Sequence, residues 1–433
     1  MKNYKFLVPI VLVALFFGSI YMLYDMKANE LNKFNTTLAA ARDSREKDIQ
    51  IDAENYYKDA LTQKPSMELY LEIGDFFLET KQMKKAVELG TTITTEYPKD
   101  AKGYEFLLGI YEQQQDYIAC FDVIETVNKR KLHSDIVSAV TERIQYTFFF
   151  NGEYQDVGVY SGGFCPVQIE GKWGYVNQVG DKKIGTRYQY TGPFSGGLAP
   201  IIDAEGATYF IDESGNKKHV LLGVETVAKL GLIENELFSM SDGSKWNFYN
   251  ANHELVFGGF DDASAIGNGI AAVKNGQSWT IVDRNGTDLT GKTYTSVIMD
   301  EKLVVSRNGR LFISNGSGYQ MISTTGEIVG STTYEDARLF LDNTYAAVKL
   351  NGKWGFVDDQ GNMVIEPQFE DARSFSNGFA AVKKDGLWGF ITKTGAVAIE
   401  PQFEDAKDFN SNGCAFIFVD NAWMLLRLYK SNH

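Results

Sequence analysis

Pairs of acidic residues recur in the second half of this 433-residue chain, and they are the side chains with the clearest potential for chemistry. Each pair follows a phenylalanine or tyrosine and precedes an alanine: Asp261-Asp262, Glu335-Asp336, Glu370-Asp371 and Glu404-Asp405. Carboxylates brought to one rim are the ligands that Ca²⁺ or a cationic molecule requires. An acidic pair at a turn also has a plainer role, in which aspartate accepts hydrogen bonds from nearby backbone amides. We favour the plainer role and expect no metal at these corners.

Other reactive side chains form no recognisable constellation. The histidines lie too far apart for a zinc site, at His133, His219, His253 and His433. The cysteines have neither metal-ligand spacing nor a disulfide framework, and we expect buried thiols at Cys120, Cys165 and Cys414. No nucleophile elbow, phosphate loop or dinucleotide fingerprint occurs. We therefore expect no catalytic residue, no cofactor and no enzyme activity.

The acidic pairs belong to a longer repeat. Residues 352–371 and 386–405 are near-duplicates, with Trp354 and Trp388 34 residues apart. Equivalent positions at similar spacing are Trp173, Thr208, Trp246, Trp279, Tyr319, Trp354, Trp388 and Trp423. The sequence therefore predicts eight copies, of which those at Thr208 and Tyr319 depart from the pattern. An insertion at residues 311–318 precedes the latter.

One copy reads as strands joined by tight turns. Residues 379–383, 388–391 and 397–399 are apolar strand segments, and the acidic corner follows the third. Asn-Gly, Asp-Gly and Glu-Gly pairs between the first two segments supply the positive φ that two-residue hairpins need. The repeated tryptophan is either a stacking platform for a sugar or peptide, or a buried strand residue. We favour the buried position.

These copies resemble WG (or KWG) repeats, which occur in bacterial proteins of mostly unknown role, across residues 147–429. The array begins out of phase, because residues 147–150 and 154–157 match 363–366 and 369–372, the piece missing after the last copy. Such an offset lets an N-terminal strand complete the last blade of a closed ring. We predict an eight-repeat propeller-like ring. The alternative is an open β-solenoid, since about 35 residues is short for a four-stranded blade.

Residues 34–146 carry a helical pattern with a period of about 34 residues. In the clearest copy Tyr70, Gly74, Ala86, Gly90 and Pro98 stand where the tetratricopeptide (TPR) consensus places aromatic, small and helix-ending residues. This part resembles about three TPR copies with a capping helix at 134–146. Such an array either holds an extended peptide in its groove or acts as a spacer.

Residues 6–24 contain no charged side chain and would measure roughly 28 Å as a helix, enough to span a bilayer. Lys2 and Lys5 precede this run, so the positive-inside rule places the N-terminus in the cytoplasm and exports the remainder. A cleaved signal peptide is the alternative, but the run ends without a small-x-small site. We expect a single-pass anchor in a bacterial cell membrane.

The sequence thus predicts a multidomain α plus β protein. Residues 1–30 form the cytoplasmic tip and anchor, 31–146 a TPR-like helical domain, and 147–433 a WG-repeat β domain. A net charge of -14 argues against nucleic acid as a partner. We expect a non-catalytic extracytoplasmic binding or scaffold protein with a protein or cell-envelope glycan as partner.

The alternative function is a carbohydrate-active enzyme of the cell envelope on a propeller fold. Such an enzyme would need a carboxylate or histidine that stands out from the repeat pattern. No copy clearly carries one, and the irregular copies around residues 219–253 and 300–319 are the places to look for it.

Overall fold

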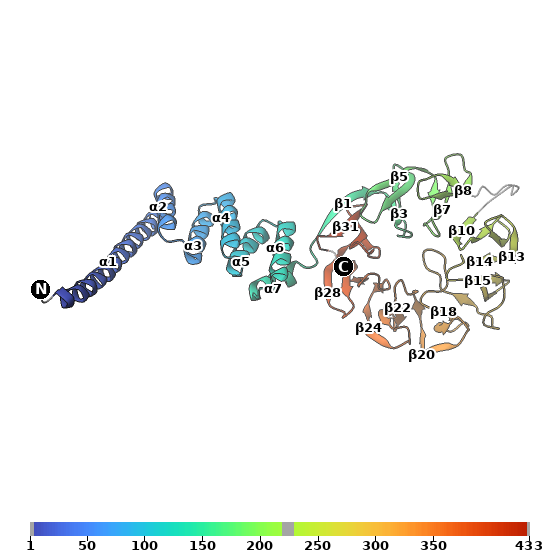
Figure 1. Cartoon of the computed structure of the whole chain (residues 1–433). Coiled ribbons are helices and arrows are strands. Elements are labelled where there is room, and N and C mark those ends of the chain that lie inside the picture. Colours follow the sequence, from blue (N-terminus) through green and yellow to red (C-terminus); the bar gives the residue numbers. More distant parts are fainter. Residues whose placement is uncertain (1–3, 219–228, 431–433) are drawn as a thin grey trace. The chain divides into compact units, whose positions relative to one another are not determined.

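A computed structural model describes residues 4–218 and 229–430, with side chains from residue 15 onward. The chain divides into two compact units, Met1–Gln145 and Tyr146–His433, the first helical and the second made of strands (Figure 1). The division falls between the last helix, which ends at Ile144, and the first strand, which begins at Phe148.

Seven helices form the described part of the first unit. They are α1 (Tyr4–Glu46), α2 (Gln50–Gln63), α3 (Met67–Glu79), α4 (Met83–Glu96), α5 (Lys102–Gln113), α6 (Tyr117–Lys129) and α7 (Asp135–Ile144). Ser66, Asp116 and Ser134 cap the N-termini of α3, α6 and α7 by accepting a backbone amide hydrogen bond. Short turns join successive helices, and four of these six turns contain one residue at positive φ: Asp48, Lys81, Gln115 and Lys131.

Small residues allow these helices to pack closely. A Cβ on Gly74 would lie 2.4 Å from the ring of Phe106, and one on Gly90 would lie 2.6 Å from Leu107. Ala86 and Ile93 are fully buried on α4. The positions that the repeat pattern marked as small or apolar are therefore helix contacts.

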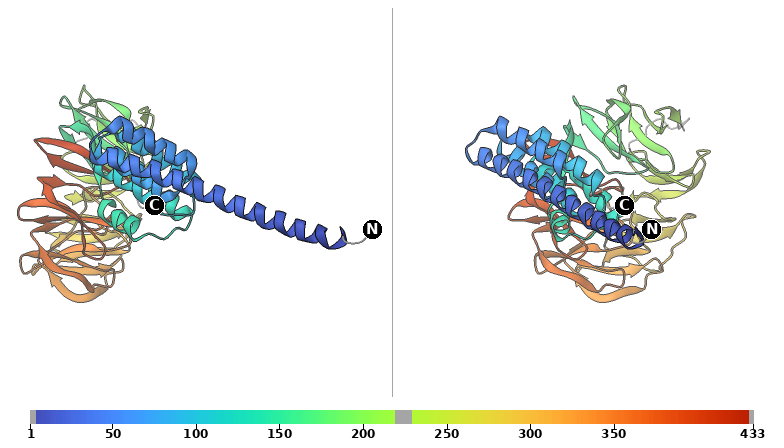
Figure 2. Two further views of the ribbon diagram at one scale, coloured as in Figure 1. Left: turned by 90° about the vertical axis from the view of Figure 1, so that its left-hand side faces the viewer. Right: turned by 60° about the vertical axis from the view of Figure 1, so that its left-hand side comes forward.

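Helix α1 extends N-terminally beyond the helix that packs against it (Figure 2). It contains residues 6–24, which we expected to span a membrane, but the side chains of residues 6–14 lie outside the described part. Among the described residues no helix has a stretch long and apolar enough to cross a bilayer.

The described strands of the second unit form eight antiparallel sheets, the blades of a propeller (Figure 1). Blade 1 contains β2 (Asp156–Val157), β3 (Phe164–Ile169), β4 (Lys172–Asn177) and β5 (Lys182–Tyr188); blade 2 contains β6 (Tyr190–Thr191), β7 (Leu198–Ile202), β8 (Thr208–Asp212) and β9 (Lys217–Lys218). Blade 3 contains β10 (Lys229–Glu234), β11 (Leu237–Ser241), β12 (Trp246–Asn250) and β13 (Leu255–Phe260); blade 4 contains β14 (Asp262–Ala263), β15 (Ile270–Asn275) and β16 (Ser278–Asp283).

The remaining blades follow the same order. Blade 5 contains β17 (Ser296–Val297), β18 (Arg310–Ser314), β19 (Tyr319–Ser323) and β20 (Ile328–Tyr334); blade 6 contains β21 (Asp336–Ala337), β22 (Ala346–Leu350), β23 (Lys353–Val357) and β24 (Met363–Phe369). Blade 7 contains β25 (Asp371–Ala372), β26 (Phe379–Lys384), β27 (Leu387–Thr392) and β28 (Val397–Phe403); blade 8 contains β29 (Asp405–Ala406), β30 (Cys414–Val419), β31 (Ala422–Leu428) and β1 (Phe148–Tyr154).

The first strand of the array closes the ring. Strand β1 pairs antiparallel with β31, with Phe148 opposite Leu428 and Tyr154 opposite Trp423. The two ends lie side by side in Figure 1, so no edge of blade 8 is left open at this point. The predicted eight-bladed ring is confirmed, and all eight tryptophan-equivalent positions lie on the third strand of a blade.

The number of strands per copy was underestimated. The acidic corner is itself a strand, because its Asp-Ala pair forms the short first strand of the next blade, as in β21, β25 and β29. A first strand of two residues explains why about 35 residues are enough for a four-stranded blade. The predicted insertion was also misplaced, since residues 311–314 belong to β18 and the extra length lies mainly before it.

Tight turns behave as the glycine pairs predicted. Both residues have positive φ in Glu170-Gly171, Asn351-Gly352 and Asp385-Gly386, the conformation of a two-residue hairpin turn. In blade 7 this turn holds Lys384 opposite Leu387, and so sets which residues of β26 and β27 face the neighbouring blades.

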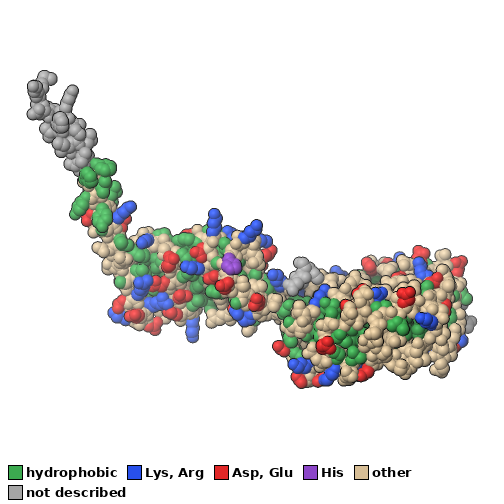
Figure 3. Space-filling view, turned by 90° about the horizontal axis from the view of Figure 1, so that it is seen from below, with side chains coloured by type: hydrophobic (Ala, Val, Ile, Leu, Met, Phe, Trp, Pro, Cys, Tyr) green, Lys and Arg blue, Asp and Glu red, His purple; other side chains and the backbone are tan. Residues whose placement is uncertain are grey.

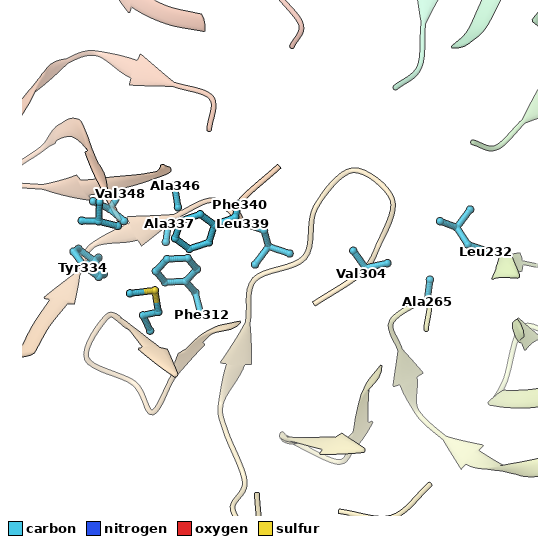
Figure 4. Packing of buried hydrophobic residues seen from close by; sticks show 12 residues of the cluster. Leu232, Ala265, Val304, Phe312, Tyr334, Ala337, Leu339, Phe340, Ala346 and Val348 are labelled. Atoms are coloured by element: carbon cyan, nitrogen blue, oxygen red, sulfur yellow. The ribbon is translucent and has the colours of Figure 1, made fainter. Parts of the chain in front are cut away.

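The hydrophobic core lies between neighbouring blades. Phe356 and Ile365 of blade 6 pack with Phe375 and Ile391 of blade 7 in one cluster. Figure 4 shows another cluster, in which Val304 on an irregular loop of blade 5 lies with Ala265 and Leu232 on one side and Leu339 on the other. The loop that carries Val304 thus shares one apolar cluster with residues of three other blades.

Candidate functional site

A cavity of about 620 Å³ lies where the first strands of several blades converge. Its walls come mainly from the segments that follow these strands, at residues 158–163, 298–302, 337–341, 373–377 and 407–411. They belong to blades 1, 5, 6, 7 and 8. The volume is within the range of cavities that bind small molecules, about 300–1,000 Å³.

Three blades place a cation at the same position of the repeat. The residue after the first strand is Arg338 in blade 6, Arg373 in blade 7 and Lys407 in blade 8, and all three line the cavity. The corresponding residues of blades 1, 2, 4 and 5 are Gly158, Gly192, Ser264 and Ile298. Because four blades form without a cation here, the blade fold does not require one.

Each cation lies over the tryptophan of its own blade, which limits the directions it can take. The distances to the ring centroids are 5.1 Å for Arg338 over Trp354, 6.0 Å for Arg373 over Trp388 and 5.8 Å for Lys407 over Trp423. These are cation–π distances. Arg338 also donates to Asp371 at 2.9 Å.

Glu301 of blade 5 reaches two of these cations. Its carboxylate accepts a hydrogen bond from Arg373 Nη1 at 2.8 Å and from Lys407 Nζ at 3.1 Å. Although burial raises the pKa of Glu301, Arg373 and Lys407 together lower it below its ordinary value. The carboxylate is therefore ionised at neutral pH and holds blade 5 to blades 7 and 8.

Glu301 is brought there by an unusually long loop. The segment between the first and second strands has twelve residues in blade 5, 298–309, against six in blade 7, 373–378. Asp300 organises the loop, because it accepts from the amides of Lys302 and Val304 and from Arg307 at 2.9 Å. The backbone carbonyl of Leu303 accepts from the amide of Ala265 on blade 4.

Two buried polar atoms beside the cavity have no hydrogen-bond partner among the described residues. They are Nε of Arg373 and Oδ1 of Asp408. Burial raises the pKa of Asp408, although Arg373 opposes the shift. A buried polar atom without a partner is costly, so a molecule that bonded to both would gain affinity from them.

Most carboxylates of the predicted acidic corners accept hydrogen bonds from nearby backbone amides. One carboxylate oxygen of Asp262, Asp336, Asp371 and Asp405 accepts the amide of the following alanine, at 2.7–2.9 Å. Asp261, Glu335 and Glu370 accept the amide of a hairpin glycine, and Glu404 is exposed. Only Asp336 of the eight lines the cavity. Within the described part of the chain, no three His, Cys, Asp or Glu side chains come together as a metal site would require.

Most of the repeated tryptophans and all three cysteines lie in the core. Trp246, Trp279, Trp354, Trp388 and Trp423 are buried, as we favoured over a stacking platform. Cys120, Cys165 and Cys414 are buried free thiols, and burial raises their pKa. His133 is exposed on the helical unit, whereas His219 and His433 lie outside the described residues.

The three cations were not predicted from the sequence, although a signal was present. The acidic corner was taken to end at the alanine, whereas the next residue is Arg, Arg or Lys in three successive copies. Residues 300–319 were predicted to be irregular, and Glu301 lies in that stretch.

Comparison with known proteins supports the repeat assignment. The family model described as "WG containing repeat" matches residues 150–173, 173–202, 321–354, 354–388 and 388–423, so the chain carries WG repeats in these stretches. No curated protein sequence matches the chain.

Several solved structures show a distant similarity to the chain. A structure titled "Crystal structure of the eukaryotic initiation factor" has 14% identity and a TM-score of 0.44, over 66% of this chain and 88% of that one. PorZ of the type-IX secretion system of Porphyromonas gingivalis has 13% identity and a TM-score of 0.34, over 63% and 42%. Hsv2p of Kluyveromyces lactis has 10% identity and a TM-score of 0.36, over 64% and 98%. These scores carry no argument about function.

Proposed function

We propose that this WG-repeat propeller belongs to a non-catalytic binding or scaffold protein that engages its partner at the central cavity. The observation that carries the proposal is the set of three cations, Arg338, Arg373 and Lys407, on successive blades around one cavity. The fold does not need them, and they are the residues in which these blades differ from the others at this position.

The helical unit offers a second surface. Its glycine and alanine contacts fit a TPR-like array, and such arrays bind extended peptides in their grooves. We propose that it either binds a protein partner or serves as a spacer between the propeller and a membrane.

Membrane anchoring is the third element of the proposal. Most residues between 16 and 24 of α1 are exposed and apolar: Phe16, Phe17, Ile20, Tyr21, Met22, Leu23 and Tyr24 (Figure 3 shows this green segment). They surround the helix and do not form a single stripe, which suits lipid better than a protein groove. With the apolar sequence from Phe6 and the lysines before it, this favours a single-pass anchor in a bacterial cell membrane and an extracytoplasmic propeller.

The binding role is tested by affinity capture from native membranes with the tagged full-length chain. Arg373→Gln combined with Lys407→Gln should lose the proteins or envelope glycans that the wild type retains. Lys245→Gln removes a cation that pairs with Asp261 away from the cavity and should retain them. Equal recovery by all three chains would contradict binding at the cavity.

The cavity also gives one observation in favour of the alternative, a carbohydrate-active enzyme. Glu301 and Asp408 line it with pKa values shifted in opposite directions, a pattern typical of two carboxyl groups with different roles in a reaction. Against this, Glu301 is engaged by two cations. Release of reducing sugar from envelope glycans by the wild type, lost in Asp408→Asn, would establish the enzyme instead.

A further inference from the structure

Two of the three cations of the cavity bond to one carboxylate, which is carried by a loop. Arg338 is paired with Asp371 of the next blade. Arg373 and Lys407 both bond to the carboxylate of Glu301, and the carboxyl group of Asp408 also lies near Arg373. Each cation still has donor capacity beyond these contacts. Neighbouring blades therefore present a fixed pair of donors suited to a carboxylate.

Glu301 is the member of this group that can leave. Its side chain is 42% exposed, whereas Arg373 is 13% and Lys407 18% exposed. It lies on a loop, while the cations follow strands and are held over tryptophan rings. An incoming carboxylate could replace that of Glu301 while the two cations remain in place.

The unpartnered atoms define what should accompany that carboxylate. Nε of Arg373 needs an acceptor, and Oδ1 of Asp408 needs a hydrogen-bonding group that is not a second anion. A hydroxyl next to a carboxylate meets both requirements.

We propose that the central cavity binds an acidic sugar. Its carboxylate replaces that of Glu301 between Arg373 and Lys407, and a ring hydroxyl bonds to Asp408. A cavity of about 620 Å³ accommodates one or two sugar rings. An acidic peptide fits less well, because its carboxylates bring no hydroxyl and a second carboxylate would meet the buried Asp408. The assignment rests on the proposed function, that this cavity is a binding site.

The test is titration of the full-length protein with D-glucuronate, followed by saturation-transfer NMR. D-glucose has the sugar ring but no carboxylate, and the dipeptide Asp-Asp has carboxylates but no sugar ring, so the two serve as controls. Glucuronate should bind at least roughly tenfold more tightly than either, since charge-assisted hydrogen bonds are the stronger ones. Comparable binding of glucose or of the dipeptide would overturn the assignment.

Two variants test the geometry in opposite directions. Arg373→Gln should weaken glucuronate binding at least roughly tenfold, while Lys245→Gln leaves it unchanged. Glu301→Gln should tighten glucuronate binding by roughly threefold to tenfold, because the carboxylate of Glu301 then no longer competes with the ligand for the two cations. Asp261→Asn is the matched control for that change. A gain of affinity cannot arise from misfolding, so Glu301→Gln remains informative if Arg373→Gln is unstable.

The outcomes separate this assignment from the broader proposal. Weaker glucuronate binding by Glu301→Gln would show that Glu301 is a ligand contact and would overturn the displacement. If no acidic sugar binds, but Arg373→Gln with Lys407→Gln loses its partners in the capture experiment, the sugar assignment fails and the binding role stands.

Discussion

Replacing Gly355 by alanine should destabilise the propeller, although this glycine has an ordinary backbone conformation. A Cβ at Gly355 would lie 2.6 Å from the carbonyl oxygen of Ile365 and 2.7 Å from the nitrogen of Pro367. Both are backbone atoms of the adjacent strand β24, where the pairing with β23 shifts register. A side chain could rotate away from such a contact, but a paired strand cannot.

The same close approach recurs wherever glycine follows the tryptophan. At Gly174 the added Cβ would lie 2.6 Å from the oxygen of Ile184, and at Gly389 it would lie 2.5 Å from that of Ile399. Blade 3 has Asn247 instead, and there the facing residue is Gly258. Blade 4 has Thr280, and its described fourth strand is reduced to isolated bridges. The glycine of the repeat is thus explained by the narrow gap between the third and fourth strands.

The magnitude follows from the forced separation of β23 and β24. Overpacking of a tight site costs about 1–3 kcal/mol, and the upper part of this range applies because only backbone movement can relieve the contact. A loss of about 2–3 kcal/mol lowers the melting temperature of a domain of this size by roughly 4–12 °C.

The assay is thermal unfolding followed by tryptophan fluorescence. All six tryptophans lie in the propeller, so the signal reports on this unit alone. The matched control is Gly185→Ala on β5, where the nearest atom to the added Cβ is 3.6 Å away, at the flexible end of Lys182. A melting temperature for Gly355→Ala equal to that of the wild type, or an equal fall for Gly185→Ala, would refute the explanation.

Four further outcomes follow from the structure and the proposals. A chain beginning at residue 155 lacks β1, so it should melt at a lower temperature than the wild type and aggregate through the exposed edge of β31. A chain beginning at residue 141 keeps β1 and should do neither. Equal melting temperatures for the two chains would contradict ring closure by β1. Millimolar Ca²⁺ should leave the melting temperature unchanged, because the acidic corners are bonded to backbone amides, and a clear rise would reveal a binding site. Burial raises the pKa of the Cys120 and Cys414 thiols to about 11, so native protein at pH 8 should react slowly with a thiol reagent and rapidly once unfolded; fast native labelling would disagree. Protease outside cells stripped of any wall or outer membrane should digest residues 30–433, and their protection would exclude export.

Much of the fold could be read from the sequence because it is periodic. The tryptophan-equivalent positions and the hairpin glycines are local patterns that most copies repeat, and the offset between the ends of the array follows from counting them. They were sufficient to predict the eight blades and the pairing of Phe148 with the far end of the chain. The two-residue first strand escaped notice, since Asp371-Ala372 is too short to show a strand pattern of its own.

The site was decided by the tertiary structure. Glu301 is 72 residues from Arg373 and 106 from Lys407, and nothing in the repeat pattern relates them. Their contact depends on the path of one long loop. Closure of the ring, the hydrogen bonds of Asp300 and the packing of Val304 together direct this loop to the cavity. The close approach of β24 to Gly355 likewise appears only in the folded chain. Periodicity shows which residues share a blade position, but contacts between different positions exist only once the strands and loops are placed in space.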